Sequence, residues 1–119
     1  MLTLSPAVGV YLYTASTDMR KSIDGLAAMV KAADIADIFS GHLFVFVSKR
    51  RDRCKILVWD DGGFVLYYKR LESGRFKLPV MDATSTSVSL SSGQLVMLLG
   101  GFDTAHLQRQ KLWTPRQRF

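Results

Sequence analysis

The chain has little of what metal sites, disulfide frameworks and membrane spans require. It contains one cysteine, three prolines, two histidines and a single glutamate among ten acidic residues. One cysteine excludes an internal disulfide and a multi-cysteine metal site, and no apolar run approaches the ~20 residues of a membrane-spanning helix. The first residues lack a basic segment before an apolar one, the pattern of secretory signals. We therefore expect a cytoplasmic protein without membrane association, in which Cys54 is a small buried hydrophobe.

Length and composition fit one folded domain. The 119 residues are 48% hydrophobic and 22% charged, as in an ordinary globular protein. We expect a single domain over residues 1–119. Residues 104–119 form a basic tail with weak periodicity, which is either docked on the domain or flexible and ordered by a partner.

The hydrophobic pattern predicts several short strands. Alternating or β-branched runs lie at Val8–Tyr13, His42–Val47, Arg53–Trp59 and Phe64–Tyr68. Asp61-Gly62-Gly63 between the last two is a tight-hairpin signal, because glycine tolerates positive φ. The polar stretch 83–92 should enter another short strand. The three central strands are apolar on both faces, so the second face must be covered by a helix, the tail or a partner chain.

Two helices should pack on this sheet. Ile23, Leu26, Ala27 and Val30 recur at helical spacing, and either Thr17 or Ser22 caps this helix. The second is predicted around residues 95–99, where Ser91 and Gln94 have capping-box spacing and Leu90 with Leu95 suits a hydrophobic staple. Gly100-Gly101 should end it. The fold class is therefore α+β, a small antiparallel sheet of about four or five strands with a central three-stranded meander and two main helices.

Positive charge is concentrated in one segment. The chain has a formal net charge of +6, and residues 49–77 carry nine basic against four acidic side chains. In an up-down-up meander, the turn after the first strand and the exit of the third lie at the same end of the sheet. Six cations should therefore converge on one rim: Lys49, Arg50, Arg51, Arg53, Lys69 and Arg70. Arginine forks suit phosphate oxygens, which favours a nucleic-acid backbone as partner over a merely solvated turn.

Other chemistry has weaker support. A two-metal nuclease needs converging acids, whereas each acidic position here has a local explanation as a helix cap or turn residue. The two histidines have no metal-ligand spacing, and no nucleophile elbow or phosphate loop occurs. The strand aromatics could stack bases but are expected in the core. We therefore predict no catalytic residue, no metal and no cofactor.

Three stretches together resemble a known family. TDMRKSIDGLAAMV (17–30), FSGHLFVFVSKRRDRCKILVWDDGGFVLYYKRLESGRFKLP (39–79) and LSSGQLVMLLGGFD (90–103) are similar to the TnpB-type accessory protein, the second open reading frame, of the insertion-sequence sixty-six family. The similarity includes the motif TDMRK and the basic turn with its hairpin. The candidate nucleic-acid-binding residues come from the rim and from these motifs. They are Arg20, Lys21, Lys49, Arg50, Arg51, Arg53, Lys55, Lys69, Arg70 and Arg75.

The resemblance implies a role in DNA transposition. Proteins of this family are encoded beside a separate, larger transposase and support its movement of the element. The expected partners are DNA, here hypothesised to be the element ends, and the transposase and other proteins of the same element. The doubly apolar sheet leaves a second copy of the chain open as a further partner. Two hypotheses follow: an accessory factor that binds DNA through the rim, or a protein-interaction subunit that scaffolds the transposase without touching DNA.

Overall fold

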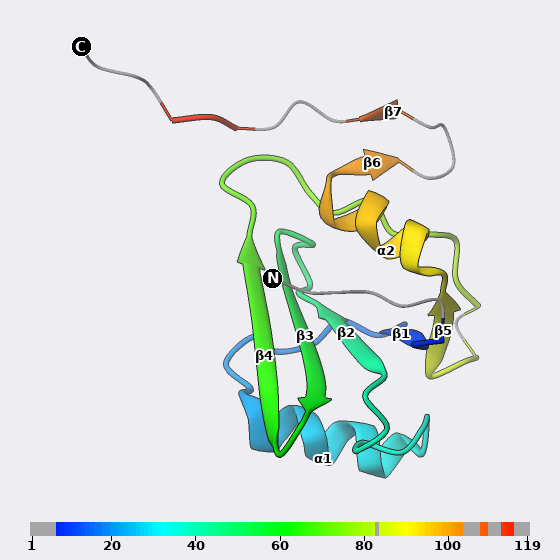
Figure 1. The fold of residues 1–119 in the computed structure, drawn as a ribbon. Helices are drawn as coiled ribbons and strands as arrows, with labels where there is room; N and C mark the ends of the chain where they lie inside the picture. The colour runs from blue at the N-terminus through cyan, green and yellow to red at the C-terminus, as the bar shows by residue number, and fades with distance from the viewer. Residues whose placement is uncertain (1–6, 83, 104–107, 110–112, 116–119) are drawn as a thin grey trace.

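A mixed five-stranded sheet lies between two helices (Figure 1). The computed structural model describes residues 7–82, 84–103, 108–109 and 113–115. The elements in chain order are β1 (Val10–Tyr13), α1 (Ile23–Ala33), β2 (Leu43–Val47), β3 (Arg53–Asp60), β4 (Gly63–Arg70), β5 (Ser87–Leu90), α2 (Ser92–Leu99), β6 (Phe102–Asp103) and β7 (Gln108–Arg109). The sheet order is β4-β3-β2-β1-β5, and β6 pairs with β7 separately.

The α+β class and the central meander are confirmed. Strands β2, β3 and β4 pair antiparallel in sequence, and β5 pairs antiparallel with β1. One pair departs from the expected antiparallel sheet, because β1 and β2 run parallel. The cause is α1, which carries the chain back across the sheet before β2 begins, as parallel neighbours require.

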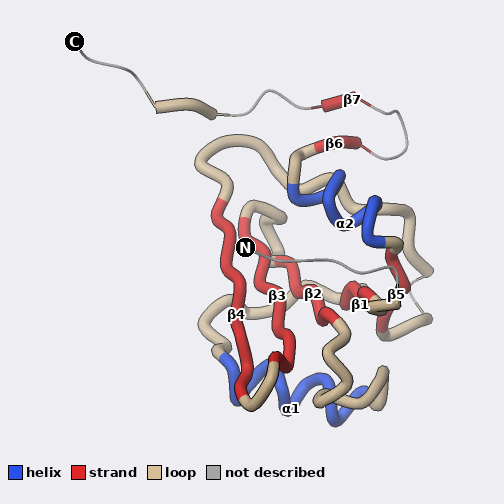
Figure 2. Tube along the Cα trace, viewed as in Figure 1, coloured by secondary structure: helices blue, strands red, loops and turns tan. Residues whose placement is uncertain are grey.

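Each face of the sheet has its own core. Phe44, Phe46 and Leu57 pack with Leu26 and Val30 of α1 on one face. The opposite face packs against α2 and the connection from β4 to β5, and its buried residues include Val45, Ile56, Phe76, Leu95 and Leu98. Figure 2 shows this long connection passing on the α2 side. Of the three coverings that the sequence allowed for the second apolar face, a helix, the tail or a partner chain, the structure has the helix, α2. All five residues of β2 are buried.

The turn and cap signals work as expected. Asp61 and Gly62 have φ values of 40° and 96°, the left-handed pair of a tight hairpin. Ser91 and Gln94 form the reciprocal capping box of α2, and Gly101, at φ 79°, follows its end. At α1, Ser22 rather than Thr17 takes the N-cap position, although its side chain makes no capping hydrogen bond.

The expected basic tail, residues 104–119, falls mostly outside the described residues. Within it, β7 pairs with β6, and Trp113 to Pro115 have no helix or strand. No helix in the described ranges has the length and apolar character to cross a membrane.

Candidate nucleic-acid interface

The basic turn between β2 and β3 is held by backbone hydrogen bonds on both sides. Within it, Arg51 N donates to Ser48 O at 2.9 Å, and Ser48 N donates to Arg53 O at 3.0 Å. The chain leaving β4 closes on the same turn, because Leu71 N donates to Asp52 O at 2.7 Å and Phe76 N to Arg51 O at 2.6 Å. Phe76 is buried in the core. The turn is therefore a rigid support for the side chains it carries.

Five of the predicted cations gather at this end of the hairpin. Arg53 lies directly opposite Arg70 in the β3–β4 ladder, and the turn residues Lys49, Arg50 and Arg51 follow β2. All five side chains are exposed. We call these residues the basic rim: Lys49, Arg50, Arg51, Arg53 and Arg70. Arg70 is the member already paired, with Glu72 at 2.9 Å.

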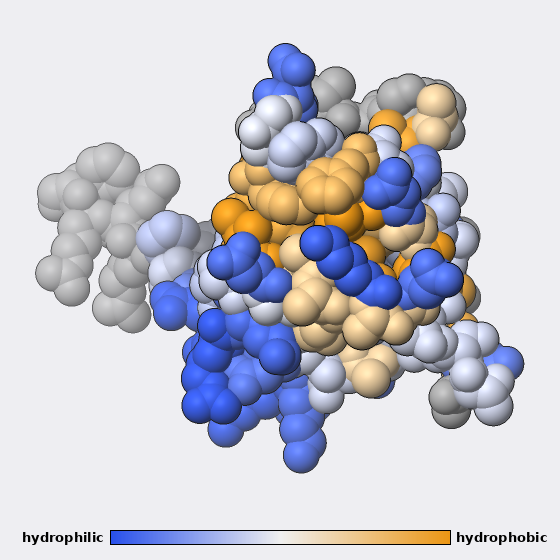
Figure 3. Space-filling view, turned by 90° about the horizontal axis from the view of Figure 1, so that it is seen from below, coloured by the Kyte–Doolittle hydropathy of each residue, from blue (hydrophilic) through white to orange (hydrophobic). Residues whose placement is uncertain are grey.

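An open hollow of about 410 Å³ lies between the rim and the segment before α1. Its lining comes from the two sequence stretches Thr17–Arg20 and Ser48–Arg53, apart from Arg51. Arg51 lies instead in the lining of two other hollows, both of which include Leu78, on the α2 side of the sheet. Thr17 N donates to Val47 O at 2.9 Å, which fixes the first stretch beside the end of β2. Seen from the α1 side, the surface divides into a dense hydrophilic region and an apolar area crossed by single polar side chains (Figure 3).

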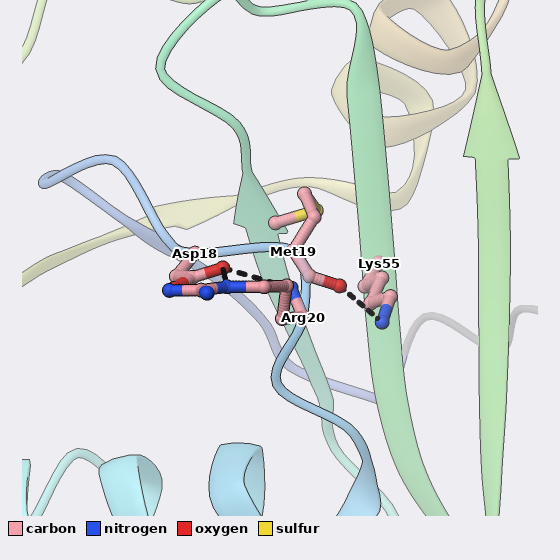
Figure 4. Close-up of polar contacts among 4 residues, drawn as sticks. All are labelled: Asp18, Met19, Arg20 and Lys55. Carbon is pink, nitrogen blue, oxygen red and sulfur yellow. Dashed lines mark hydrogen bonds and ion pairs between the residues drawn. The ribbon is translucent and has the colours of Figure 1, made fainter.

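Within the hollow, Asp18 is engaged by Arg20. The Arg20 guanidinium donates to both Asp18 carboxylate oxygens, at 2.7 Å for the closest pair, and Arg20 N donates to the same side chain at 2.9 Å (Figure 4). These hydrogen bonds hold the pKa of Asp18 at about 2. Arg20 therefore lies beside the rim with its charge partly balanced, and the carboxylate stays ionised at neutral pH.

Lys55, a member of the candidate set, is not on the rim. Its side chain is buried on the α1 face, where Nζ donates to the backbone carbonyls of Met19 and Lys21, each at 2.8 Å (Figure 4 shows the first). The ammonium also lies 5.0 Å from the centre of the Tyr68 ring. This lysine fixes the segment that precedes α1 to the sheet.

Lys69 likewise serves the fold. It faces the α2 side, and its Nζ donates to Leu99 O, at the carboxyl end of α2, at 2.8 Å. A cation there satisfies a terminal carbonyl and complements the helix dipole. Lys21 and Arg75 are exposed, but neither lines the hollow. The predicted convergence therefore holds in space for the turn residues and Arg70, while Lys55 and Lys69 bind backbone.

The acidic residues have the local roles expected of them. Asp37 accepts from Phe39 N and Asp82 from Thr84 N, both at 2.9 Å, while Asp34 ends α1 in the left-handed region. Among the described residues, no group of three histidine, cysteine or acidic side chains gathers as a metal site would require. Cys54 is buried as predicted, and burial raises its pKa to about 12, which makes the thiol unreactive.

Sequence reasoning left Thr17 and Ser48 out of the site. Both line the hollow. Thr17 is 5% exposed, and its hydroxyl has no hydrogen-bond partner among the described residues, whereas the Ser48 hydroxyl donates to Asp52 at 3.1 Å. The signal available for Thr17 was its place at the start of the TDMRK motif. Its proximity to the basic turn depends on a tertiary contact between β1 and β2 that no spacing reveals.

Fold and site together define a small α+β protein with a rigid, strongly basic rim and, among its described residues, no cluster of three side chains that could hold a metal ion. A family model described as IS66 Orf2 like protein matches residues 8–109. The chain therefore belongs to the IS66 Orf2-like family, and membership implies an accessory protein associated with transposition.

Two relatives from Sinorhizobium fredii (strain NBRC 101917 / NGR234) are similar over nearly their whole length. The uncharacterized protein y4jC is 34% identical over 116 residues, covering 97% of both chains. The uncharacterized protein y4hO is 36% identical over 116 residues, covering 97% of this chain and 96% of its own. No solved structure matches the chain.

Proposed function

We propose that this protein is a non-catalytic accessory factor that binds DNA through the basic rim, at the ends of the mobile element, and helps the transposase assemble there. The observation that carries the proposal is the set of free cations on a rigid turn. Among the rim residues, all of which lie in the described part of the chain, Arg70 is the member with an ion pair, to Glu72. The remaining rim cations are thus available to phosphates.

The hollow supports this reading. Lys49, Arg50 and Arg53 line it, and its two carboxylates are engaged by neighbours, Asp18 by Arg20 and Asp52 by Ser48. Arginine forks around a concave surface suit phosphate oxygens, and such contacts position a duplex without reading its sequence. Binding through them releases counterions and is therefore strongly salt-dependent.

A second candidate is a protein-interaction subunit that contacts the transposase without DNA. It is favoured by apolar side chains exposed far from the rim: Phe39 is 51% exposed and packs edge-on against Trp59, close to the acidic hairpin turn. DNA binding would use the basic rim, and transposase contact would use the opposite end of the hairpin, near Phe39. Variants at one end therefore distinguish the two functions.

The test uses a rim variant that carries Lys49→Gln, Arg50→Gln, Arg51→Gln and Arg53→Gln. Fluorescence anisotropy with a terminal-repeat duplex of the element and a scrambled duplex should show roughly a thousandfold loss of affinity at 0.1 M salt if all four cations contact phosphates. Transposition frequency in cells should fall in parallel. Lys31→Gln, on α1 beside Phe39, is the control and should bind as the wild type does.

Unchanged affinity and unchanged transposition in the rim variant would contradict the proposal. The interaction subunit is the better account if two results are found together. Transposition survives in the rim variant, and the transposase no longer copurifies with a Phe39→Ser variant from nuclease-treated lysate.

A further inference from the structure

The two edges of the sheet differ in length and chemistry. β5, at one edge, has four residues, two of them serines. β4, at the other, has eight residues, and its register with β3 runs without a bulge through eight pairs. Among the described residues no strand pairs with the outer side of β4, which forms one side of the sheet in Figure 1. Proteins usually protect long edges with charge, proline or bulges, and residues 64–68 of β4 have none of these.

The register shows which groups of β4 face outward. The two-residue turn makes Asp60 and Gly63 a hydrogen-bonded pair, and such pairs alternate along an antiparallel ladder. The N–H and C=O groups of Gly63, Val65, Tyr67 and Lys69 therefore point to β3. Those of Phe64, Leu66 and Tyr68 point away from the sheet. Beside them, the side chains of Val65 and Tyr68 are 45% and 49% exposed.

The ends of β4 carry opposite charges. Asp60 at the end of β3 and Asp61 in the turn lie beside its first residue. Its last residue, Arg70, lies opposite Arg53 and pairs with Glu72, so this end keeps an excess of positive charge. An antiparallel copy of the same strand brings the basic end of each beside the acidic turn of the other. A parallel copy would place like charges together. The charge pattern therefore favours an antiparallel partner strand with an acidic start and a basic end, as a second copy of β4 has.

We propose that two copies of this protein pair through β4, antiparallel and around a two-fold axis, to form one continuous sheet. A register centred on Leu66 uses the outward N–H and C=O groups, sets Phe64 opposite Tyr68 of the second copy, and sets Val65 opposite Tyr67. Aromatic pairs of this kind stabilise antiparallel sheets. Arg70 then lies next to the turn holding Asp61 of the second copy. The interface is isologous and closes as a dimer.

This arrangement places the two basic rims at opposite ends of the joined sheet. If the rims bind DNA as proposed above, one dimer holds two DNA segments. The pairing itself does not depend on DNA, so it is tested without DNA.

The first experiment is amide hydrogen exchange of the wild-type protein, followed by NMR, with sedimentation equilibrium of the same sample. The expected mass is twice the 13.3-kDa chain mass, and the amides of Phe64, Leu66 and Tyr68 should be as protected as those of Val65 and Tyr67. A monomer at 100 µM, or a dimer in which the three outward amides exchange rapidly, would overturn the proposal.

The second experiment uses a matched pair of edge variants. Val65→Lys puts a charge on the β4 edge, and Ser89→Lys puts the same charge on the β5 edge. Val65→Lys should raise the dimer dissociation constant at least tenfold and expose the outward amides, with the inward amides of β4 still protected as proof of folding. Ser89→Lys should sediment as the wild type does. Equal dimerisation of both variants would refute the β4 interface.

Discussion

The basic rim and the two lysines of the same hairpin, Lys55 and Lys69, carry the same positive charge but have different roles. At the rim, the turn exposes cations whose heads lie in water beside a hollow. On the two faces of the hairpin, Lys55 reaches the segment before α1 and Lys69 reaches the end of α2. A basic segment is therefore not one site. Position within the strand decides whether an ammonium binds the protein's own backbone or remains available to a partner.

The rim cations and the two backbone-bound lysines also differ in what they contribute to folding stability. A solvated rim cation contributes little to folding, because exposed charges are already stabilised by water. A buried ammonium must be satisfied internally, and its loss leaves carbonyl groups without a donor. Substitutions at the rim should therefore change DNA binding with little change in stability, while substitutions of the face lysines should do the reverse.

The largest stability effect is expected for Lys55→Met. Methionine fills the space of the lysine stem but cannot donate to Met19 O and Lys21 O, so unfolding free energy should fall by about 2 kcal/mol. Urea denaturation measures it. DNA affinity at a temperature where the variant is folded should stay within about twofold of the wild type. A variant of native stability with strongly reduced DNA binding would erase the distinction between rim and faces.

A smaller effect separates two exposed cations at opposite ends of the molecule. Arg53→Gln removes one rim charge, and Lys31→Gln removes one charge near the acidic hairpin turn. Loss of one phosphate contact should weaken DNA binding roughly five- to tenfold at 0.1 M salt for Arg53→Gln, with little change for Lys31→Gln. Equal losses in both variants, measured by anisotropy titration, would mean that net charge rather than the rim determines binding.

Turn, cap and helix-periodicity signals predicted the local structure of this molecule, whereas the distribution of charge predicted the site only in part. The Asp61-Gly62 turn, the Ser91 capping box and the α1 stripe each depend on residues close in sequence, and the structure has all three. The pairing of β1 with β2 depends on the path of α1, which periodicity does not encode.

The same limit applies to the site. Convergence of the turn residues with Arg70 followed from strand topology. The inward direction of Lys55 did not follow, because its burial depends on where the segment before α1 docks. Lys69 shows the same dependence, since its acceptor comes from α2, 30 residues away in sequence.

The smallest expected effect concerns Arg20, which lines the hollow beside the rim. Arg20 holds the pKa of Asp18 at about 2, whereas an unperturbed aspartate titrates near 3.9. The folded chain thus binds this proton more weakly than the unfolded chain, so the pair favours folding above pH ~4 and loses that contribution as the pH falls toward 2. In an NMR titration, Arg20→Gln should move the Asp18 midpoint up toward its ordinary range. An unmoved midpoint would show that other groups lower the pKa.

The most direct test of the central claim is the salt dependence of DNA affinity for the wild type and for the fourfold rim variant. Each phosphate contact contributes about 0.9 to the slope of log affinity against log salt concentration. We predict that the variant's slope is shallower than that of the wild type by about 3.6 if all four cations contact phosphates. Equal slopes, or no binding of either protein at low salt, would contradict a DNA-binding rim.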